Sequence, residues 1–205
     1  MKKGLFITFE GGDGAGKSTQ IKLLHEYLQE KGIEVVLTRE PGGTAVGESI
    51  RNIILDSANT EMTDMTECML YAAARAQIVN ELIIPSLEAG KTVICDRFID
   101  SGLAYQSYGR GLGDAVMDIN RHAIGDCMPD VTFLLKAPPK VGSKRISGRE
   151  LDRIEQASED FHDRVYNGYL ELEKSYPDRI VGIDGTQSIS EISSIIRSRI
   201  DELIR

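Results

Sequence analysis

The chain has 205 residues, of which 41% are hydrophobic and 27% charged, and its formal net charge is −8. This composition is typical of a globular protein, and the acidic balance excludes an extended nucleic-acid partner, whose binding surface would be basic. No apolar run approaches a membrane span, and Met1-Lys2-Lys3 leads straight into the first expected strand, so we expect neither a membrane anchor nor a cleavable signal. Cys68, Cys95 and Cys127 form no CxxC pair, which argues against disulfides and zinc and favours the cytoplasm.

Strand-like and helix-like patterns alternate along the chain. We expect strands at residues 4–10, 34–39, 92–96, 131–136 and 179–184, and the third and fourth are continuously apolar, as in buried parallel strands. Apolar residues recur at helical spacing in a helix ending at Lys31-Gly32, over 44–57, from Met65 to Ile83 and over 190–205. This alternation predicts an α/β fold in which helices cover both faces of a five-stranded parallel sheet. Without repeats or linkers, residues 1–205 are expected to form a single domain.

Residues 11–18 read Gly-Gly-Asp-Gly-Ala-Gly-Lys-Ser, the pattern of a phosphate-binding loop. An apolar strand precedes the loop and a helical pattern follows it, which is the context that this motif requires. The glycines let backbone N–H groups turn toward phosphate oxygens, while Lys17 adds a charge and Ser18 a hydroxyl ligand for Mg²⁺. The residues expected to bind a nucleoside triphosphate are Gly11, Gly12, Asp13, Gly14, Ala15, Gly16, Lys17, Ser18 and Thr19.

A dinucleotide-binding turn is the nearest alternative for a glycine-rich loop after a first strand. Its fingerprint needs glycines at the first, third and sixth positions. Counting from Gly12, the sixth position is Lys17, and counting from Gly11, the third is Asp13. The spacing therefore excludes this alternative.

Three further segments indicate which phosphotransferase this is. The second strand leads into Arg39-Glu40-Pro41-Gly42-Gly43-Thr44, the third ends in Asp96-Arg97-Phe98, and a basic segment spans 145–153. Ligands of open parallel sheets bind beyond the carboxyl ends of the strands, so these charges can converge. With the loop, and with Leu151-Asp152-Arg153-Ile154-Glu155, these segments make nearly the whole chain similar to the thymidylate kinases, P-loop enzymes that phosphorylate dTMP with ATP.

The resemblance implies roles for the residues around the phosphates. Asp13 would accept a hydrogen bond from the sugar 3′-hydroxyl, Arg39 would clamp the dTMP phosphate, and Arg97 would bridge the donor and acceptor phosphates. Asp96 follows an apolar strand, where a carboxylate that holds Mg²⁺ is expected. The alternatives are a helix cap for Asp13, a surface salt bridge for Arg39 and a plain Asp–Arg pair at a strand end for Asp96 and Arg97.

The resemblance also assigns the nucleoside pocket. Tyr71 and Arg75 lie one helical turn apart, where the family packs an aromatic ring on thymine and donates from the arginine to a base carbonyl. Tyr105 would press on the sugar where a ribose 2′-hydroxyl would project, and Ser101 and Gln106 lie near the base. Tyr71 could equally be a core residue. The family often has a polar residue at the position of Gly102.

Five basic residues lie between Lys140 and Arg153. Such a run is usually a solvated helix face. Because the phosphate loop contains no arginine, however, the resemblance is to family members whose catalytic arginine comes from a mobile lid. We expect this lid at about 143–155, with Arg149 and Arg153 as the catalytic cations and Gly148 as a hinge.

Two other classes of function remain open. One is another nucleotide or deoxynucleoside kinase of the same architecture, and the other is a non-catalytic ATP-binding regulator. A regulator would more often have lost Lys17, Ser18 or Asp96, and all three are present. The family forms homodimers, and the second and third helices here carry more apolar surface than one sheet face requires, so a homodimer is expected.

Overall fold

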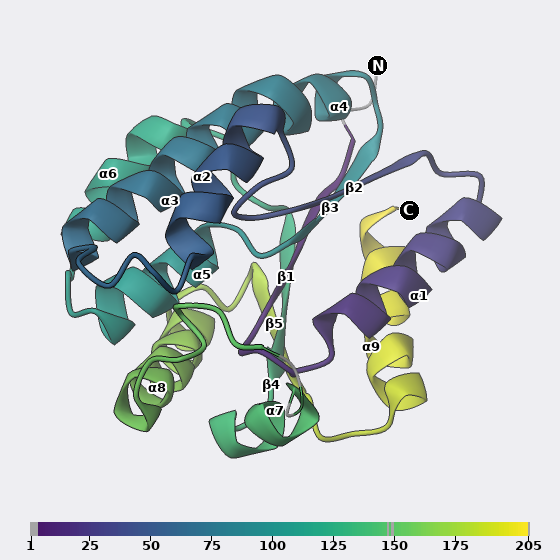
Figure 1. Ribbon diagram of the computed structural model, residues 1–205. Helices are drawn as coiled ribbons and strands as arrows, with labels where there is room; N and C mark the ends of the chain where they lie inside the picture. The colour runs from purple at the N-terminus through teal and green to yellow at the C-terminus, as the bar shows by residue number, and fades with distance from the viewer. Residues whose placement is uncertain (1–3, 147, 149, 205) are drawn as a thin grey trace.

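The computed structural model describes residues 4–146, 148 and 150–204. Figure 1 shows strands and helices alternating along most of this chain. The elements in order are β1 (Phe6–Glu10), α1 (Lys17–Glu30), β2 (Val35–Arg39), α2 (Ala45–Leu55), α3 (Asp64–Ile78), the π-helix η1 (Val79–Ile83), α4 (Ile84–Glu88), β3 (Thr92–Asp96), α5 (Ile99–Gly102), the π-helix η2 (Leu103–Gly109), α6 (Ala115–Ile124), β4 (Val131–Lys136), α7 (Pro139–Ile146), α8 (Glu159–Ser175), β5 (Ile180–Asp184) and α9 (Ile189–Leu203).

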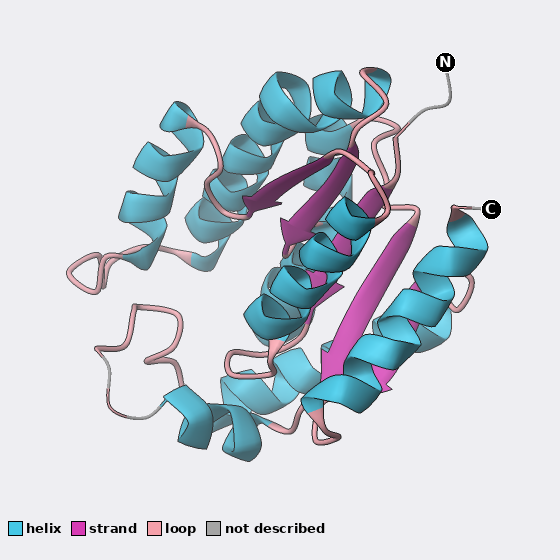
Figure 2. Cartoon of the chain, turned by 90° about the vertical axis from the view of Figure 1, so that its right-hand side faces the viewer, coloured by secondary structure: helices cyan, strands magenta, loops and turns pink. Residues whose placement is uncertain are grey.

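Within the described residues, the strands form a five-stranded sheet in the order β2-β3-β1-β4-β5, with every neighbouring pair parallel. Helices lie on both faces of the sheet, as Figures 1 and 2 show from two directions. The predicted fold class is therefore confirmed, and each expected strand is present with ends shifted by two residues at most. Because all the strands run the same way, their carboxyl ends meet at one edge of the sheet.

The central strand β1 separates two apolar cores. Phe6 faces a core built with α3, α6 and α8, while Ile7 and Phe9 face a second core built with α1 and α9. This alternation is the period of two that a strand imposes on its side chains. With both faces covered, β1 is fixed in place, and so is the loop that follows it.

The predicted helices are present, and side-chain caps mark several of their starts. Thr44, Thr63, Ser158 and Ser188 each accept a hydrogen bond from the backbone N–H three residues on, at the starts of α2, α3, α8 and α9. The helix after the phosphate loop ends before Gly32, whose φ of 73° favours glycine.

The long helix expected from Met65 to Ile83 is a more complex element. A helical path runs from Asp64 to Glu88, but residues 79–83 form the π-helix η1 between α3 and α4. Pro85 stands near the start of α4, where its missing N–H is tolerated. A π-helix has one more residue per turn than an α-helix, so it shifts which side chains face the core. The apolar spacing alone did not reveal this shift.

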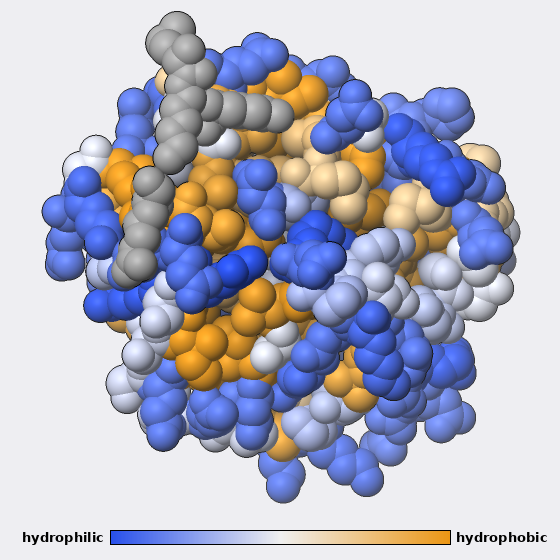
Figure 3. Space-filling view, turned by 180° about the vertical axis from the view of Figure 1, so that it is seen from behind, coloured by the Kyte–Doolittle hydropathy of each residue, from blue (hydrophilic) through white to orange (hydrophobic). Residues whose placement is uncertain are grey.

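Polar residues form most of the rim of the face seen in Figure 3, with apolar residues gathered toward its middle. Across the described part of the chain, no helix has both the length and the apolar character needed to cross a membrane. At the carboxyl edge of the sheet, residues from β2, β3, α1, α2, α3 and η2 line a cavity of about 730 Å³.

Candidate functional site

The phosphate loop lies at the carboxyl end of β1 and opens into this cavity. Gly11, Gly14 and Gly16 have φ values of 127°, 73° and 101°, which side chains with a Cβ rarely adopt. A Cβ on Gly14 would also lie 2.4 Å from the carbonyl oxygen of Gly142 in α7. Glycine is thus required by both the loop conformation and the close approach of α7.

Lys17 begins α1 and points back across the loop. Its Nζ donates to the carbonyl oxygens of Gly11 and Gly12 at 2.9 and 3.0 Å. Burial, followed by the charge of Arg97, lowers the pKa of Lys17 from 10.5 to about 8. An anionic ligand would stabilise the protonated amine, which makes this position suited to phosphate.

Arg97 lies at the end of β3 with a φ of 71°, the left-handed region that non-glycine residues rarely adopt. Its guanidinium donates to Asp13 at 2.7 Å and to Gly11 O at 3.0 Å, and it lies over the ring of Tyr105. Burial alone raises the pKa of Asp13, but the charges of Arg97 and Lys17 outweigh it and lower the pKa overall. The structure therefore brings Lys17, Arg97 and Asp13 together in one cluster.

The left-handed backbone of Arg97 is held by Glu10, a fully buried residue at the end of β1. Glu10 accepts hydrogen bonds from the N–H groups of Phe98 and Ser101 and from the hydroxyls of Ser101 and Tyr169. Burial and the neighbouring Asp100 raise the pKa of Glu10 to about 7. Although this residue carries the loop that presents Arg97, sequence reasoning missed it. The feature of the sequence that could have indicated Glu10 is a lone acidic residue at the end of an apolar strand.

Asp96 and Ser18 border the same cavity. Asp96 Oδ1 is buried and accepts no hydrogen bond from the described residues. A buried carboxylate oxygen without a donor is costly unless a cation or water meets it. Together with the exposed hydroxyl of Ser18, this oxygen fits the oxygen ligands that Mg²⁺ prefers.

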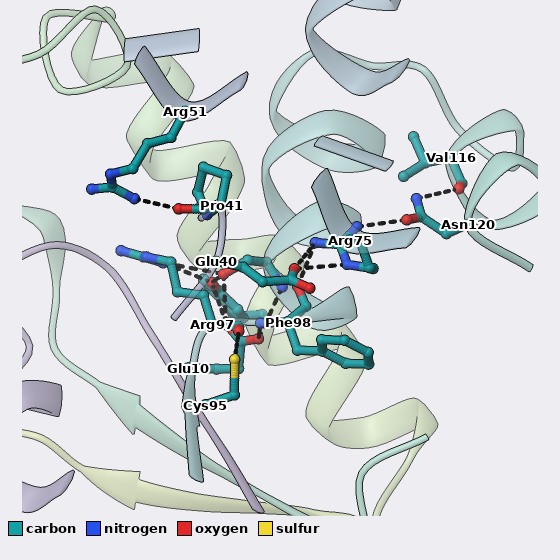
Figure 4. Close-up of polar contacts among 12 residues, drawn as sticks. Glu10, Glu40, Pro41, Arg51, Arg75, Cys95, Arg97, Phe98, Val116 and Asn120 are labelled. Atoms are coloured by element: carbon teal, nitrogen blue, oxygen red, sulfur yellow. Dashed lines mark hydrogen bonds and ion pairs between the residues drawn. The ribbon is translucent and has the colours of Figure 1, made fainter. Parts of the chain in front are cut away.

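Arg39 and Arg51 both line the cavity. Arg39, at the end of β2, pairs with Glu48 of α2 at 2.9 Å, and its side chain is 54% exposed. Arg51 of α2, which sequence reasoning did not single out, donates to Pro41 O at 2.8 Å (Figure 4). The salt bridge considered as the alternative for Arg39 is thus present, and the side chain still lines the cavity.

Arg75 is fixed almost completely by buried partners (Figure 4). Its Nε and Nη2 approach Glu40 Oε2 at 2.8 and 2.6 Å, its Nη1 donates to Asn120 Oδ1 and its Nη2 to Phe98 O. Although only 1% exposed, Arg75 lines the cavity. These contacts leave an Nη1 hydrogen for a ligand.

Gly102 keeps that hydrogen accessible. A Cβ at Gly102 would lie 3.2 Å from Arg75 Nη1, closer than most real Cβ contacts. Because its other partners hold the guanidinium in place, it cannot readily move away from such a Cβ. The glycine that departs from the family pattern therefore leaves space beside Arg75.

The other residues predicted to bind the nucleoside also line the cavity: Tyr71, Ser101, Tyr105 and Gln106. Tyr105 is buried and packs edge-on against the rings of Phe161 and Tyr169. Burial raises the pKa of Tyr71 and of Tyr105, so both phenols stay neutral. Gln106 Nε2 donates to Glu67 at 3.0 Å.

The basic segment is only partly gathered at the site. Arg145 on α7 donates to Gly14 O at 3.1 Å and lines the cavity. Arg153 does not line it, because its guanidinium donates to Ile54 O and to Glu67 Oε2, the latter at 2.6 Å. Arg149 lies outside the described residues. The catalytic roles of Arg149 and Arg153 stay predictions.

Comparison with known proteins agrees with this geometry. Residues 9–196 match the family model described as thymidylate kinase. The chain belongs to the thymidylate kinase family. The thymidylate kinase of Exiguobacterium sp. is 52% identical over 188 residues, covering 91% of this chain and 89% of that protein. That of Geobacillus sp. strain WCH70 is 48% identical over 194 residues, covering 93% and 92%.

A solved structure shares the fold as well. The crystal structure of thymidylate kinase from Ehrlichia chaffeensis is similar with a TM-score of 0.79 at 36% identity, and the similarity covers 97% of this chain and 99% of that one. The resemblance to the thymidylate kinase family that rested on the loop and on the two arginine segments is thereby confirmed.

Two more residues of this thymidylate kinase site were missed from the sequence. Glu67 precedes Tyr71 and Arg75 at intervals of four residues, so it lies on the same helix face. Gly142 lies so close to the phosphate loop that a Cβ there would be 2.1 Å from Asp13 O. The periodicity gave a signal for Glu67, whereas a single glycine in a short helix gave none.

Proposed function

We propose that this chain transfers the γ-phosphoryl group of ATP to dTMP, giving dTDP and ADP for dTTP synthesis. The observation that carries the proposal is one cavity with a phosphate loop at one end and the Tyr71, Arg75 and Gln106 pocket at the other. A nucleoside monophosphate in that pocket would direct its phosphate toward the cluster of Lys17 and Arg97. Membership of the thymidylate kinase family supports dTMP as the acceptor.

Phosphoryl transfer depends on positioning and charge compensation more than on covalent chemistry. In this proposal the backbone N–H groups of the loop and Lys17 hold the donor phosphates. Arg39 exchanges Glu48 for the acceptor phosphate, since their exposed ion pair costs little to break. Arg97 lies between the two and donates to both, which places its charge where it can stabilise the transition state.

Asp96 and Ser18 would hold Mg²⁺. Their fit rests on the buried Asp96 Oδ1 that lacks a donor. When bound, the ion neutralises charge on the phosphate oxygens. Asp13 stays ionised beside Arg97, so it can accept the hydrogen bond of the sugar 3′-hydroxyl while it orients the guanidinium.

The nucleoside is recognised by its base and by its sugar. Tyr71 packs on thymine, and the Nη1 hydrogen of Arg75 meets the base carbonyl O4. Arginine only donates, so it matches O4 of thymine and not the C4 amino group of cytosine. Tyr105 is positioned to exclude a ribose 2′-hydroxyl. Ser101 accepts a hydrogen bond from Arg97 Nη1 and donates its own proton to Glu10 Oε2.

Residues 143–155 act as a lid in this proposal, within a single domain. Gly148 has a φ of 101° and offers a hinge. On closing, Arg149 and Arg153 would approach the transferring phosphoryl group, for which Arg153 would leave Glu67. An arginine supplied in this way stabilises charge only in the transition state.

We further propose that the chain acts as a cytoplasmic homodimer. The exposed apolar residues on α2 and α3 support the dimer: Val46, Ile53, Met65 and Met69, which are 36–55% exposed. The scattered, buried cysteines are those of a protein from a reducing compartment.

ADP release with a panel of acceptors tests the proposal. We expect dTMP to be used best, dUMP about 10- to 200-fold less well for want of the methyl group, and CMP, AMP and thymidine poorly. A preference for thymidine would favour a deoxynucleoside kinase. ATP binding without transfer to any acceptor would favour a regulator, and either result would overturn the proposal.

A further inference from the structure

A buried carboxylate lies between the nucleoside pocket and the basic segment. Glu67 stands on α3, one turn before Tyr71, and its side chain is 1% exposed. Gln106 Nε2 donates to its Oε1 at 3.0 Å, while Arg110 and Arg153 approach its Oε2 at 2.9 and 2.6 Å. In the roles assigned above, Glu67 is only the partner that Arg153 leaves when the lid closes.

The charge of Glu67 fixes the orientation of the Gln106 amide. Burial by itself raises the pKa of Glu67, but hydrogen bonds from Arg110, Gln106 and Arg153 outweigh it and lower the pKa, so the group is ionised. An ionised carboxylate only accepts hydrogen bonds, so it requires the NH₂ group of the amide to face it. The amide oxygen of Gln106 is then the atom left for a ligand.

That oxygen is an acceptor available to a ligand in the cavity. Gln106 lines the cavity, and no described residue donates to its Oε1. Arg75 can only donate. The hydroxyl of Ser101 is already committed, since its proton goes to Glu10 Oε2 at 2.6 Å. The pocket therefore presents a donor from Arg75 and an acceptor from Gln106.

We propose that Glu67 is a positioning residue for base specificity, which holds the oxygen of Gln106 toward the N3–H of thymine beside the donor that Arg75 offers to O4. This inference rests on dTMP as the acceptor. Cytosine has an amino group at C4 and an unprotonated N3, so it mismatches both contacts. The amide cannot rotate to suit cytosine, because its oxygen would then face the Glu67 carboxylate.

The test compares kcat/KM for dTMP and dCMP in the wild type and in Glu67→Gln. An amide at position 67 can donate to the oxygen of Gln106, so it permits the rotation. We expect the preference for dTMP over dCMP to fall about tenfold, the scale of one mismatched hydrogen bond. A purely structural role would lower both values in proportion and leave the preference unchanged.

Arg110→Gln is the matched control. It removes a partner of Glu67 but keeps the carboxylate that orients Gln106, so the preference should stay within about twofold of the wild type. If Glu67→Gln does not fold because two guanidinium groups lose their counter-charge, Glu67→Gln/Arg110→Gln restores the balance of charge. The same tenfold fall is expected for this pair, on the scale of one hydrogen bond.

Gln106→Met separates this inference from the proposed function. Its preference for dTMP should fall, and adding Glu67→Gln should change it no further, since the amide to be oriented is gone. If Gln106→Met lowers the preference and Glu67→Gln does not, the role of Glu67 is wrong and the base site stands. If Gln106→Met leaves the preference unchanged, the role of Gln106, and with it that of Glu67, is overturned. A wild type that does not phosphorylate dTMP refutes the proposed function itself.

Discussion

Single residues at the carboxyl edge of the sheet bring opposite charges into a small volume. Lys17 is buried and the Arg97 side chain is 16% exposed, and both donate to the carbonyl oxygen of Gly11, while Arg97 also pairs with Asp13. Because the two cations lie close together, their repulsion raises the free energy of the ligand-free site. A bound polyphosphate lowers this free energy again. The cluster is thus organised for an anion before one binds.

Replacing Lys17 by alanine should abolish transfer without unfolding the chain. Burial and the charge of Arg97 disfavour the protonated form of Lys17 in the ligand-free protein, so removing the side chain should cost little folding free energy. Losing its charge on the transferring phosphoryl group should lower kcat about 10³-fold or more. Lys22→Ala, on the same helix with a side chain 77% exposed, is the control and should keep wild-type turnover. Near-normal turnover in Lys17→Ala would mean that the loop is not the donor site.

The buried acid Glu10 should make stability depend on pH. Its folded pKa of about 7 exceeds the ordinary 4.5, so between these values the folded chain binds a proton that the unfolded chain does not. Its contribution to the free energy of unfolding is therefore fully present below pH 4.5 and is lost as the pH rises through 7.

Urea unfolding of the wild type and of Glu10→Gln between pH 5 and pH 7.5 measures this contribution. The uncharged amide should remove a slope of at most about 1.4 kcal/mol per pH unit. Parallel stability curves for the two proteins would show that Glu10 does not titrate in this range.

Tyr105 should set the preference for deoxyribose. Tyr105→Ala opens space beside the sugar, so the use of UMP relative to dUMP should rise about tenfold, the scale of one steric or hydrogen-bond mismatch. Tyr105→Phe keeps the ring and should keep the discrimination, since the exclusion is steric. Equal UMP-to-dUMP ratios in the wild type and in Tyr105→Ala would assign the selection to another group.

At the scale of elements, α7 packs directly against the phosphate loop. Gly14 and Gly142 meet backbone to backbone, and Arg145 donates to Gly14 O from the same helix. Farther along the chain, Arg153 ties the segment before α8 to α2 and α3. The proposed lid segment therefore contacts the phosphate loop through Arg145 and contacts α2 and α3 through Arg153.

Arg149→Ala and Arg153→Ala test the lid. If these groups engage only when the lid is closed, kcat should fall more than dTMP affinity, and at least one variant should approach a 10³-fold loss, about the scale of an arginine finger. Single-turnover kinetics and dTMP titration separate the two effects. Lys140→Ala, an exposed cation on α7, is the control. Unchanged kcat in both arginine variants would make the segment a solvated helix face.

At the scale of the whole molecule, α2 and α3 leave apolar side chains uncovered. Ile53 and Met69 are 48% and 55% exposed, although α2 and α3 already pack against each other. A second copy of the chain would bury this surface, as stable homodimers do.

Ile53→Glu and Met69→Glu should convert a dimer to a monomer, because a charge in a buried apolar interface is costly. Light scattering after gel filtration gives the mass of each variant. Ile195→Glu places the same charge on α9 at a side chain that is 40% exposed, and it should leave the mass unchanged. A wild type that is monomeric at every concentration would refute the dimer.

The sequence by itself determined the strands, several of the helices and the phosphate loop. These features depend on neighbours along the chain: apolar runs, helical spacing, and the glycines that a positive φ requires. The family and its reaction followed, because motifs such as 11–18 and 96–98 are continuous stretches of chain. Even the convergence of Arg39 and Arg97 could be predicted, since parallel strands end at one edge of the sheet.

Only the tertiary structure decided the partners of the charged residues. Arg75 with Glu40 and Asn120, and Arg153 with Glu67, join residues that are 35 to 86 positions apart. No local pattern reports such pairs, because burial selects among many possible counter-charges once the helices have packed. The π-helix at 79–83 was not predicted either, since apolar spacing indicates a helix but not whether a turn carries an added residue.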